Sequence, residues 1–526
     1  TKVYCTLCRQ DDSILSISLA KVRDGRKNQT GLENKGRMGT NKTGSIVLLL
    51  VLLEICICQI LDNNINTMSE YSPYERQGLP NPVEELVKDF TGNYKLVRYQ
   101  PRHIHIAYGS SPTEMVITWS TLQNPNKTSY VEFGTKHLAE RSQNGSVTEF
   151  QEQSSLRLKQ YIHRVVLTQL IPGQTYLYHC GSDMGWSEIF YFTAMREGAD
   201  WLPHLAIYGD LGNVNAVSLV RLQRETHLGV YDAIIHVGDF AYDMNSESGL
   251  VGDAFMDQIQ PIAGYLPYMV CPGNHEWSGN FHQYKNRFTM PGNENSMFYS
   301  WNMGPIHFIS LSTEFYYFLQ YGIAPVIRQY EWLEKDLEEA NRTRAERPWI
   351  ITYGHRPMYC SNDDRDDCTK HETLVRVGIP YFHWYGLEDM FMKYGVDLSI
   401  WAHEHSYERL WPTYNHKVYN GSLAEPYRNP KALTHVTTGS AGCSEKHDPF
   451  PETRPEWTAY RSTDYGFSRL KPLNNTHLYF EQLSEDQDGK IIDSFYLIRE
   501  KHEGYEIPKA IATNNIDIHD SVENSL

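Results

Sequence analysis

Five short polar fragments, each placed directly after an apolar run, constrain this chain more than any other feature of its 526 residues. They are GDL, GDFAY, GNHE, YGH and AHEH, at residues 209–211, 238–242, 273–276, 353–355 and 402–405. The fragments offer carboxylate, amide and imidazole groups, which are common metal ligands. One such fragment would be ordinary turn chemistry, but the ordered set supplies enough oxygen and nitrogen ligands for two adjacent ions.

From residue 205 onward, apolar strand-like runs alternate with helical patterns. We predict a helix over 214–228 and strands at 205–208, 232–237, 268–270, 307–311, 349–352, 398–400 and 435–437. This alternation is typical of an α/β domain, and we expect a layered β-sandwich flanked by helices over residues 200–500. Ligands of such sheets collect beyond the carboxyl ends of the strands, where all five fragments lie.

Residues 97–196 follow a different pattern, with short strand-like runs separated by polar loops. We predict strands at 116–119, 130–133, 163–167, 176–178 and 190–192. The stretch before Tyr176 resembles the corner of fibronectin-like sandwiches, in which a Tyr hydroxyl bonds nearby backbone. We therefore expect a fibronectin-like β-sandwich ahead of the α/β domain, with Trp119 in its core.

The first 60 residues resemble a leader rather than part of a core. The chain begins at Thr1, and Met38 is followed by Lys42 and the apolar run 46–53. A basic segment before a short apolar core is typical of a secretory signal peptide. We predict a signal peptide at 38–60, preceded at 1–37 by an upstream extension foreign to the native protein. A signal-anchor is the alternative, although the run is shorter than the roughly 20 residues of a membrane span.

Sequons and cysteines favour an oxidising compartment. The pattern Asn-x-Ser/Thr occurs in polar, loop-like stretches at Asn126, Asn144, Asn341, Asn420 and Asn474. Cys360 and Cys368 flank an Asp-rich loop, so we expect a local disulfide between them. We predict a glycoprotein that is secreted or lumenal, on the extracellular or lysosomal route, with a polar tail at 505–526.

The net charge narrows the possible partners. It is −16 at pH 7, which argues against sequence-independent nucleic-acid binding, since such binding uses Lys and Arg at phosphates. We expect no nucleic-acid partner and no stable membrane span.

The ligand types indicate phosphoester hydrolysis. A phosphate ester is an anion, so a catalyst must cancel charge before an anionic nucleophile can attack. Two cations about 3.5–4 Å apart clamp the phosphoryl oxygens and convert a bound water to hydroxide near neutral pH. Holding such a pair takes a bridging carboxylate and further oxygen and nitrogen ligands. The fragments provide Asp210, Asp239, Asn274, His355, His403 and His405.

The same fragments, with YGHRPMY and AHEHSYERL read in full, resemble the purple acid phosphatases, a family of calcineurin-like metallophosphoesterases. The resemblance covers about 97–500 and is closer to the animal-type branch. Its most specific element is Tyr242, because generic calcineurin-like enzymes lack this residue. It implies that Fe(III) is held by Asp210, Tyr242 and His405. It also implies a divalent ion (Zn, Fe or Mn) held by Asn274, His355 and His403, with Asp239 bridging the two.

Other residue roles are also implied by the resemblance. His275 would face the substrate, stabilising the phosphoryl charge or protonating the leaving alkoxide. Glu276 would orient a neighbouring group, and residues 407–409 would brace the site. Ala402 stands where the family has glycine. After His355 the plant enzymes carry two substrate-facing histidines, whereas this chain has RPMYCSN and an Asp-rich loop, which leaves His371 as a weak candidate.

The sequence thus predicts a secreted acid phosphatase that hydrolyses phosphomonoesters by attack of a metal-bound hydroxide at a dinuclear Fe(III)–M(II) centre. The resemblance implies an acidic optimum, because Fe(III) keeps its hydroxide deprotonated at low pH. Two alternatives stay open: a phosphodiesterase or nucleotide pyrophosphatase on the same metals, and a non-catalytic metal-binding glycoprotein. The oligomeric state is open as well, with Cys443 either a buried thiol or an interchain bridge.

Overall fold

The computed structural model describes residues 97–152, 159–292, 294–363, 365, 367–380 and 382–507. The predicted extension at 1–37, the signal peptide at 38–60 and most of the polar tail at 505–526 lie outside these ranges and stay predictions. Within the described ranges, no helix combines the length and apolar character that crossing a membrane requires.

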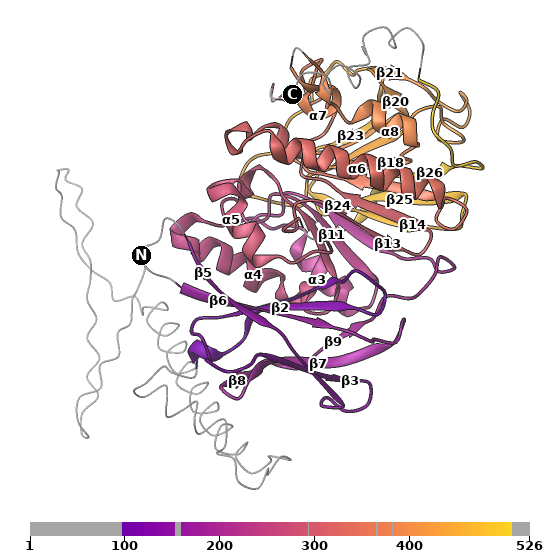
Figure 1. Cartoon of the computed structure of the whole chain (residues 1–526). Coiled ribbons are helices and arrows are strands. Elements are labelled where there is room, and N and C mark those ends of the chain that lie inside the picture. The colour runs from indigo at the N-terminus through magenta and orange to yellow at the C-terminus, as the bar shows by residue number, and fades with distance from the viewer. Residues whose placement is uncertain are drawn as a thin grey trace, which may run out of the picture. The chain divides into compact units, whose positions relative to one another are not determined.

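After a 3-10 turn, η1 (Val97–Tyr99), the chain forms a sandwich of two antiparallel sheets (Figure 1). One sheet has the order β1 (Arg102–Tyr108), β2 (Met115–Thr121), β6 (Lys159–Leu167) and β5 (Ser146–Gln151). The other contains β4 (Arg141–Asn144), β3 (Tyr130–Gly134), β7 (Thr175–Ser182), β8 (Gly185–Trp186) and β9 (Phe190–Thr193). The strands predicted for this region are all present, and the predicted β-sandwich is confirmed.

Two aromatic residues occupy the positions expected of them in the sandwich. The hydroxyl of Tyr176 accepts the backbone N–H of Ile171 at 2.9 Å, which closes the predicted corner. Trp119 is 1% exposed and stacks on His163, with the ring centroids 5.0 Å apart. Burying a large aromatic side chain in this way contributes strongly to the stability of the core.

A larger, layered domain follows. Its first sheet has the order β12 (Tyr268–Cys271), β11 (Ala233–Val237), β10 (Leu205–Tyr208), β24 (Gly466–Pro472), β25 (His477–Ser484) and β26 (Lys490–Ile498). Its second sheet has the order β13 (Tyr299–Met303), β14 (Ile306–Ser310), β15 (Trp349–Tyr353), β18 (Leu398–Trp401), β22 (Thr434–Thr438), β19 (Tyr407–Leu410) and β23 (Thr458–Ser462). The sheets pack together, and Ser468 Oγ on β24 lies 2.9 Å from Thr438 Oγ1 on β22.

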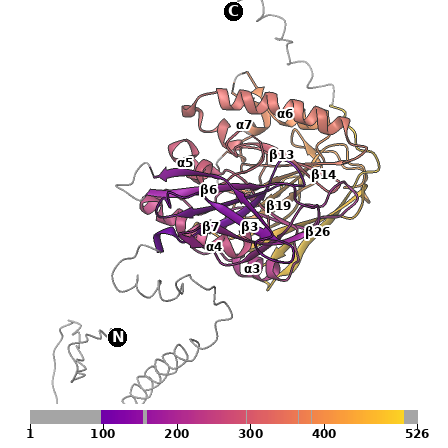
Figure 2. The same ribbon diagram turned by 60° about the horizontal axis from the view of Figure 1, so that its bottom comes forward.

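Helices flank the two sheets, as the sequence predicted. Figures 1 and 2 show α3 (Leu219–His227) and α4 (Leu250–Ala263) on one side, and α6 (Ala324–Arg342) on the other. The other α-helices of the described residues are α5 (Ser278–Arg287), α7 (Leu374–Val377) and α8 (Glu388–Tyr394). In α6, Val326, Leu333 and Leu337 are buried at helical spacing, which gives the helix one apolar face toward the sheet.

Short turns and hairpins complete the domain. The 3-10 turns are η2 (Ser246–Gly249), η3 (Asn274–Glu276), η4 (Thr313–Tyr316) and η5 (Leu319–Tyr321). The two-residue strands form pairs β16 (Gly378–Ile379) with β17 (Trp384–Tyr385), and β20 (Thr413–Tyr414) with β21 (Lys417–Val418).

The helix predicted over 214–228 begins later than expected, at Leu219, so the prediction was wrong for residues 214–218. Asn215 adopts a left-handed backbone conformation with a φ of +63°. Its side-chain Nδ2 donates to the carbonyl of Cys443 at 2.8 Å. A contact with a segment more than 200 residues away therefore overrides the local helical pattern.

The small sandwich contacts the larger domain near the start of β12. Tyr178 OH donates to the carbonyl of Gly264 at 2.6 Å, and Ile106 forms an isolated bridge with Pro267. Arg102 pairs with Asp257 of α4 at 2.5 Å. These contacts hold the amino end of β12, whose carboxyl end leads to one of the polar turns.

Candidate metal centre

The five polar turns meet at the carboxyl ends of β10, β11, β12, β15 and β18. The first three strands are parallel neighbours in one sheet, and the last two are parallel neighbours in the other. The turns after β11, β12 and β18 border a cavity of about 420 Å³ that is lined by Asp239, Asn274, His275, His403, His405, Glu445, Lys446, His447 and Asp448. The structure thus brings the sequence-predicted ligands together at one end of the two sheets.

Small residues allow the turns to approach each other. A Cβ atom at Gly273 would lie 2.2 Å from Asp239 Oδ1, which no real contact permits. A Cβ atom at Gly209 would lie 2.3 Å from the Cβ of Ala402. The methyl group of Ala402 is therefore accommodated because residue 209 has no side chain.

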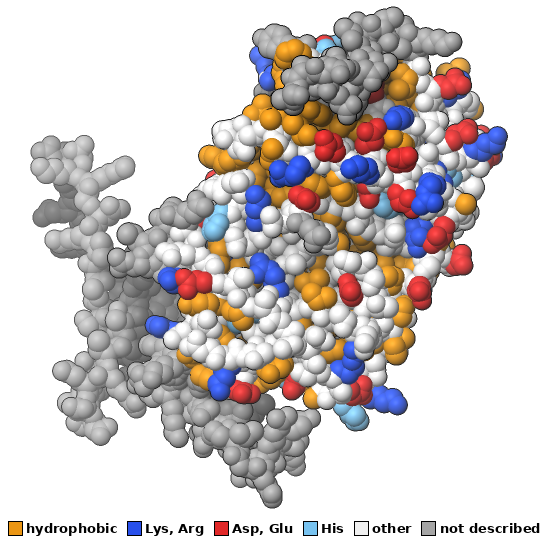
Figure 3. Space-filling view, in the orientation of Figure 1, with side chains coloured by type: hydrophobic (Ala, Val, Ile, Leu, Met, Phe, Trp, Pro, Cys, Tyr) orange, Lys and Arg blue, Asp and Glu red, His pale blue; other side chains and the backbone are white. Residues whose placement is uncertain are grey.

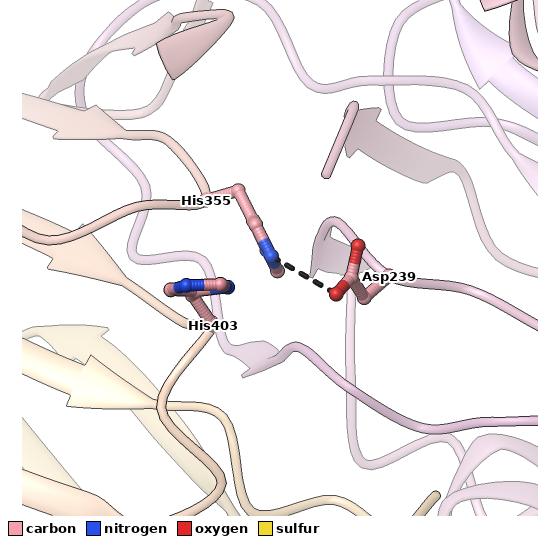
Figure 4. A group of neighbouring side chains, drawn as sticks. All are labelled: Asp239, His355 and His403. Carbon is pink, nitrogen blue, oxygen red and sulfur yellow. Dashed lines mark ion pairs between the residues drawn. The ribbon is translucent and has the colours of Figure 1, made fainter. Parts of the chain in front are cut away.

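One group of ligands surrounds His355 (Figure 4). Single ligand atoms of Asp239, His355 and His403 lie within 4.8 Å of one another. His355 Nε2 lies 3.1 Å from Asp239 Oδ2 and 3.1 Å from Asn274 Oδ1. The Nδ1 atom of His355 lies 2.9 Å from the carbonyl of Val237 and donates to it. This bond leaves Nε2 as the nitrogen directed at the carboxylate and the amide.

His403 has two charged side chains near its Nε2 atom. Its Nε2 atom lies 2.9 Å from Arg356 Nη1 and 3.7 Å from Asp367 Oδ1. The Nε2 atom of His403 therefore faces two charged side chains from the segment that follows His355.

A second group surrounds Tyr242. The hydroxyl oxygen of Tyr242 lies 3.2 Å from Asp210 Oδ1 and 2.7 Å from His405 Nε2. His405 Nε2 lies 3.6 Å from Asp210 Oδ1. The other ring nitrogen, Nδ1, lies 3.0 Å from the carbonyl of Lys446 and donates to it. Three donor atoms from three turns therefore converge here.

Several ligand residues have unusual backbone conformations. The φ angle is +58° at Asp210, +51° at Asp239, +57° at Tyr242 and +71° at His403. Left-handed conformations of residues other than glycine cost about 1–3 kcal/mol each and cluster at functional sites. The bond from the His403 backbone N–H to Asp210 Oδ2, at 3.0 Å, helps to hold two of these turns.

Buried carboxylates dominate the electrostatics of both sets of ligands. Burial, together with the carboxylates of Asp210 and Asp239, raises the pKa of Tyr242 well above its ordinary value. Burial also raises the pKa of Asp239, but His355 and His275 outweigh it and hold this pKa well below its usual range. A nearby cation would favour the anionic forms of both residues. With hard oxygen and imidazole donors and a shared carboxylate, these residues fit a pair of metal ions.

His275 borders the same cavity without belonging to either ligand group. Its Nδ1 atom lies 3.1 Å from Asp243 Oδ1, and its backbone N–H donates to Asp239 Oδ1 at 2.9 Å. Burial lowers the pKa of His275, but the carboxylates of Asp239 and Asp243 outweigh it and raise the pKa to about 9. The imidazole is held as a proton donor beside the ligands.

Three family models match successive parts of the chain. "Purple acid Phosphatase, N-terminal domain" matches residues 101–194, "Calcineurin-like phosphoesterase" matches 203–407, and "Iron/zinc purple acid phosphatase-like protein C" matches 432–494. Acid phosphatase type 7 of Danio rerio is 56% identical over 416 residues, covering 77% of this chain and 92% of the relative. The protein of the same name from Homo sapiens is 53% identical over 402 residues, covering 76% and 91%. The chain belongs to the purple acid phosphatase family.

Membership in this family makes the chain a metal-dependent phosphatase of the calcineurin-like class. The structure of purple acid phosphatase PPD1 from yellow lupin (Lupinus luteus) has a TM-score of 0.65 and 24% identity, covering 76% of this chain and 75% of the lupin chain. That likeness supports the order of the two domains, a β-sandwich followed by the layered α/β domain.

This purple acid phosphatase braces its ligand turns with buried carboxylates. Glu276 accepts three backbone N–H groups, from Asp239 and Gly273 at 2.9 Å each and from Phe240 at 3.1 Å. The carboxylate therefore holds two ligand turns together, which agrees with an orienting role. The 407–409 segment is also anchored, because Arg409 Nε pairs with buried Asp493 at 2.7 Å.

The predicted disulfide between Cys360 and Cys368 is present. It closes the Asp-rich loop that follows His355. His371 stacks on His416, with the ring centroids 4.4 Å apart, and is not among the residues that line the cavity. The structure gives His371 no place in the site.

Sequence reasoning missed the residues that close the cavity on its other side. Glu445, Lys446, His447 and Asp448 line it, and Asp448 Oδ2 accepts the backbone N–H of His405 at 2.6 Å. It also missed Arg356 and Asp367, which face His403. Neither segment contains a recognisable ligand spacing, so no signal in the sequence could have identified them.

The sequon asparagines and the free cysteines are not among the residues that line the cavity, although one thiol lies beside a ligand histidine. Asn126, Asn144 and Asn474 are exposed, whereas Asn341 and Asn420 are half-buried. Cys180 and Cys271 are buried free thiols. That thiol belongs to Cys443, whose buried Sγ lies 3.7 Å from His405 Nδ1. Its burial favours the thiol over the interchain bridge.

Proposed function

We propose that this chain hydrolyses phosphomonoesters at a dinuclear centre of Fe(III) and a divalent ion. The observation that carries the proposal is the meeting of two ligand groups at one cavity, with Asp239 beside His355 and His275 at the rim. The proposal is consistent with the names of the relatives, which are acid phosphatases.

The residues divide into two subsites. Asp210, Tyr242 and His405 would hold Fe(III), because a phenolate is a hard anionic ligand. Asn274, His355 and His403 would hold the divalent ion, which we take to be Zn, Fe or Mn. Asp239 would bridge the two. When bound, the two cations supply positive charge to the phosphoryl oxygens and lower the pKa of a water.

Two further residues of the chain, His275 and Glu276, would supply a proton and hold the ligand turns in place. His275 points a ring nitrogen at the cavity while Asp243 holds the other nitrogen at 3.1 Å. In that orientation it donates a proton toward a phosphoryl oxygen or the leaving oxygen. Glu276 fixes the turns that carry Asp239 and Asn274, so the substrate meets a site that is already ordered.

We also propose that the protein is secreted or lumenal. The disulfide between Cys360 and Cys368 supports this, because such bonds persist in oxidising compartments. Glycosylation is proposed at all five sequons, and the exposed Asn126, Asn144 and Asn474 are the best placed for it. The signal peptide at 38–60 belongs to the same proposal.

The test is kcat/KM against pH for an activated aryl phosphomonoester, with the matching diester measured in parallel. The proposal expects turnover on the acid side of neutral and a preference for the monoester. His275→Ala should lower kcat by about 10²–10⁴-fold while both ions stay bound. A preference for the diester would favour the phosphodiesterase alternative, and absence of turnover with both ions present would overturn the proposal.

A further inference from the structure

Residues 445–448 line the cavity without supplying any of the proposed metal ligands. Three contacts attach this segment to His405. The carbonyl of Lys446 accepts from His405 Nδ1 at 3.0 Å, and Asp448 Oδ2 accepts the backbone N–H of His405 at 2.6 Å. The Nδ1 atom of His447 lies 3.3 Å from the His405 carbonyl. The main chain on both sides of Lys446 is therefore held beside a ligand histidine.

Lys446 is the only Lys or Arg among the described residues that line the cavity. Its side chain is exposed, and with the described part of the chain its ammonium group forms no ion pair or hydrogen bond. Other lysines of this acidic protein are paired, since Lys159 Nζ lies 2.6 Å from Glu149 and Lys393 Nζ lies 3.0 Å from Glu334. Figure 3 likewise shows many Lys and Arg side chains beside Asp or Glu. The cavity is thus lined by a cation that is open to a ligand.

The two acidic neighbours of Lys446 have other partners. The Oε1 atom of Glu445 lies 3.7 Å from His275 Nε2, and its Oε2 atom lies 4.0 Å from His405 Nε2. Asp448 accepts the backbone N–H of His405. Neither carboxylate therefore neutralises the ammonium group by a direct ion pair.

Lys446 lies on the side of His405 that faces away from Tyr242. The Nε2 atom of His405 is 2.7 Å from the Tyr242 hydroxyl, whereas its Nδ1 atom bonds to the Lys446 carbonyl. In the proposed function the phosphoryl group lies at the ions and beside His275. Lys446 is therefore placed to meet the organic part of the substrate.

The chemistry of lysine indicates which group it would bind there. Lysine offers one compact positive charge with three donors on a flexible stem. One such charge balances one carboxylate, whereas a phosphate group carries nearly two negative charges at neutral pH. A carboxylate on the organic part of the substrate is thus the best match.

We propose that Lys446 is a specificity-determining residue that binds a carboxylate on the organic part of the phosphomonoester. The preferred substrates are then phosphomonoesters whose leaving alcohol or phenol carries a carboxylate. A cation at a cavity also attracts such anions from solution. The inference rests on the proposed phosphomonoester hydrolysis and narrows its substrate class.

The experiment uses the full chain carrying both ions. It measures kcat and KM for phenyl phosphate and for the ortho, meta and para carboxyphenyl phosphates. The quantity compared is the ratio of kcat/KM for each carboxylated ester to kcat/KM for phenyl phosphate. Lys446→Met removes the charge and keeps an unbranched stem, whereas Lys446→Arg keeps the charge.

For at least one isomer we expect the ratio to fall about fivefold in Lys446→Met, the upper end of what an exposed ion pair contributes. Lys446→Arg should stay within about twofold of the wild type. The fall should come from a higher KM for the carboxylated ester, because a contact made equally in the ground state and the transition state leaves kcat unchanged. Added salt should shrink the difference, since it screens exposed charges.

Lys417→Met is the matched control. Lys417 is exposed on β21 and is not among the residues that line the cavity. This variant removes one positive charge from the protein elsewhere, so its ratios should equal those of the wild type.

Wild-type ratios for all three isomers in Lys446→Met would overturn the inference. An equal loss of kcat/KM for phenyl phosphate and every carboxylated ester would also overturn it, because Lys446 would then act on the phosphoryl group. If the wild type hydrolyses none of these monoesters with both ions bound, the proposed function itself fails, which is a distinct result.

Discussion

Replacing Glu276 with alanine tests how the turns after β11 and β12 are held together. Glu276 is 2% exposed, and its two oxygens accept the backbone N–H groups of Asp239, Gly273 and Phe240. Each buried polar group left unpaired costs about 1–3 kcal/mol, so three would cost about 3–9 kcal/mol. Water entering the vacated space can satisfy part of this loss. We therefore expect the free energy of unfolding to fall by about 3 kcal/mol, the lower end of that range.

Glutamine at the same position gives a graded comparison. Its carbonyl oxygen, placed where Oε2 lies, still accepts from Asp239 and Gly273, while its amide group meets the N–H of Phe240. One donor in three then loses its acceptor, so the cost should be about 1–3 kcal/mol. The expected order of stability is wild type, then Glu276→Gln, then Glu276→Ala.

Urea unfolding followed by tryptophan fluorescence measures these free energies, and amide hydrogen exchange locates the loss. Exchange should accelerate at Asp239, Phe240 and Gly273, while β25 and β26 stay protected. Glu294→Ala is the control, because the Glu294 side chain is 42% exposed and surface changes usually stay within about 0.5 kcal/mol. An alanine variant as stable as this control, with unchanged exchange at the three amides, would refute the reasoning.

Three further predictions address other parts of the molecule. A tyrosinate bound to Fe(III) gives a visible charge-transfer band, so Tyr242→Phe should abolish the colour of the iron-loaded protein and leave the fold intact. A variant that keeps its colour would contradict the ferric assignment. Burial raises the pKa of Asp397, but Arg344 and Arg499 outweigh it and hold the pKa well below its usual range. Asp397→Asn should cost about 3–5 kcal/mol at neutral pH. The stabilisation by this ion pair is fully present above the ordinary Asp pKa of about 3.9 and is lost as pH falls through the lowered pKa. Urea unfolding should therefore show a smaller difference in stability between the wild type and the variant in acid. A difference that does not change with pH would contradict the ion-pair account. Chelating both ions should lower stability by about 2.7 kcal/mol per ion held at 100 times its dissociation constant, and identical melting with and without metal would contradict binding to the folded turns.

The sequence alone predicts those ligands whose position depends only on a strand and the turn that follows it. Asp210, Asp239 and Asn274 each follow a glycine that lies one or two residues beyond the end of a buried strand. Parallel strands place such turns at one edge of a sheet. The convergence of these side chains could therefore be predicted without knowing how the rest of the chain packs.

The parts that could not be predicted depend on contacts between distant segments. Asp367 reaches His403 because Arg356 and a disulfide hold its loop in place. The main-chain carbonyl of Lys446 accepts a hydrogen bond from His405, and such a bond does not depend on which residue stands at 446. The late start of α3 has the same cause, since Asn215 bonds to a carbonyl in the segment that borders the cavity. Local patterns carry no information about such bonds.

The two sheets supply different chemistry to the centre, and this division explains how the site is ordered. All three ligand imidazoles follow strands of the seven-stranded sheet, whereas the carboxylates, the phenol and the amide follow strands of the six-stranded sheet. Each proposed ion therefore takes ligands from both sheets and joins their ends. Protein bonds already cross the same boundary: His355 donates to the Val237 carbonyl, and the His403 backbone N–H donates to Asp210. These bonds join the ends of the two sheets at the place where the ligands lie, so they help to order the turns that carry them.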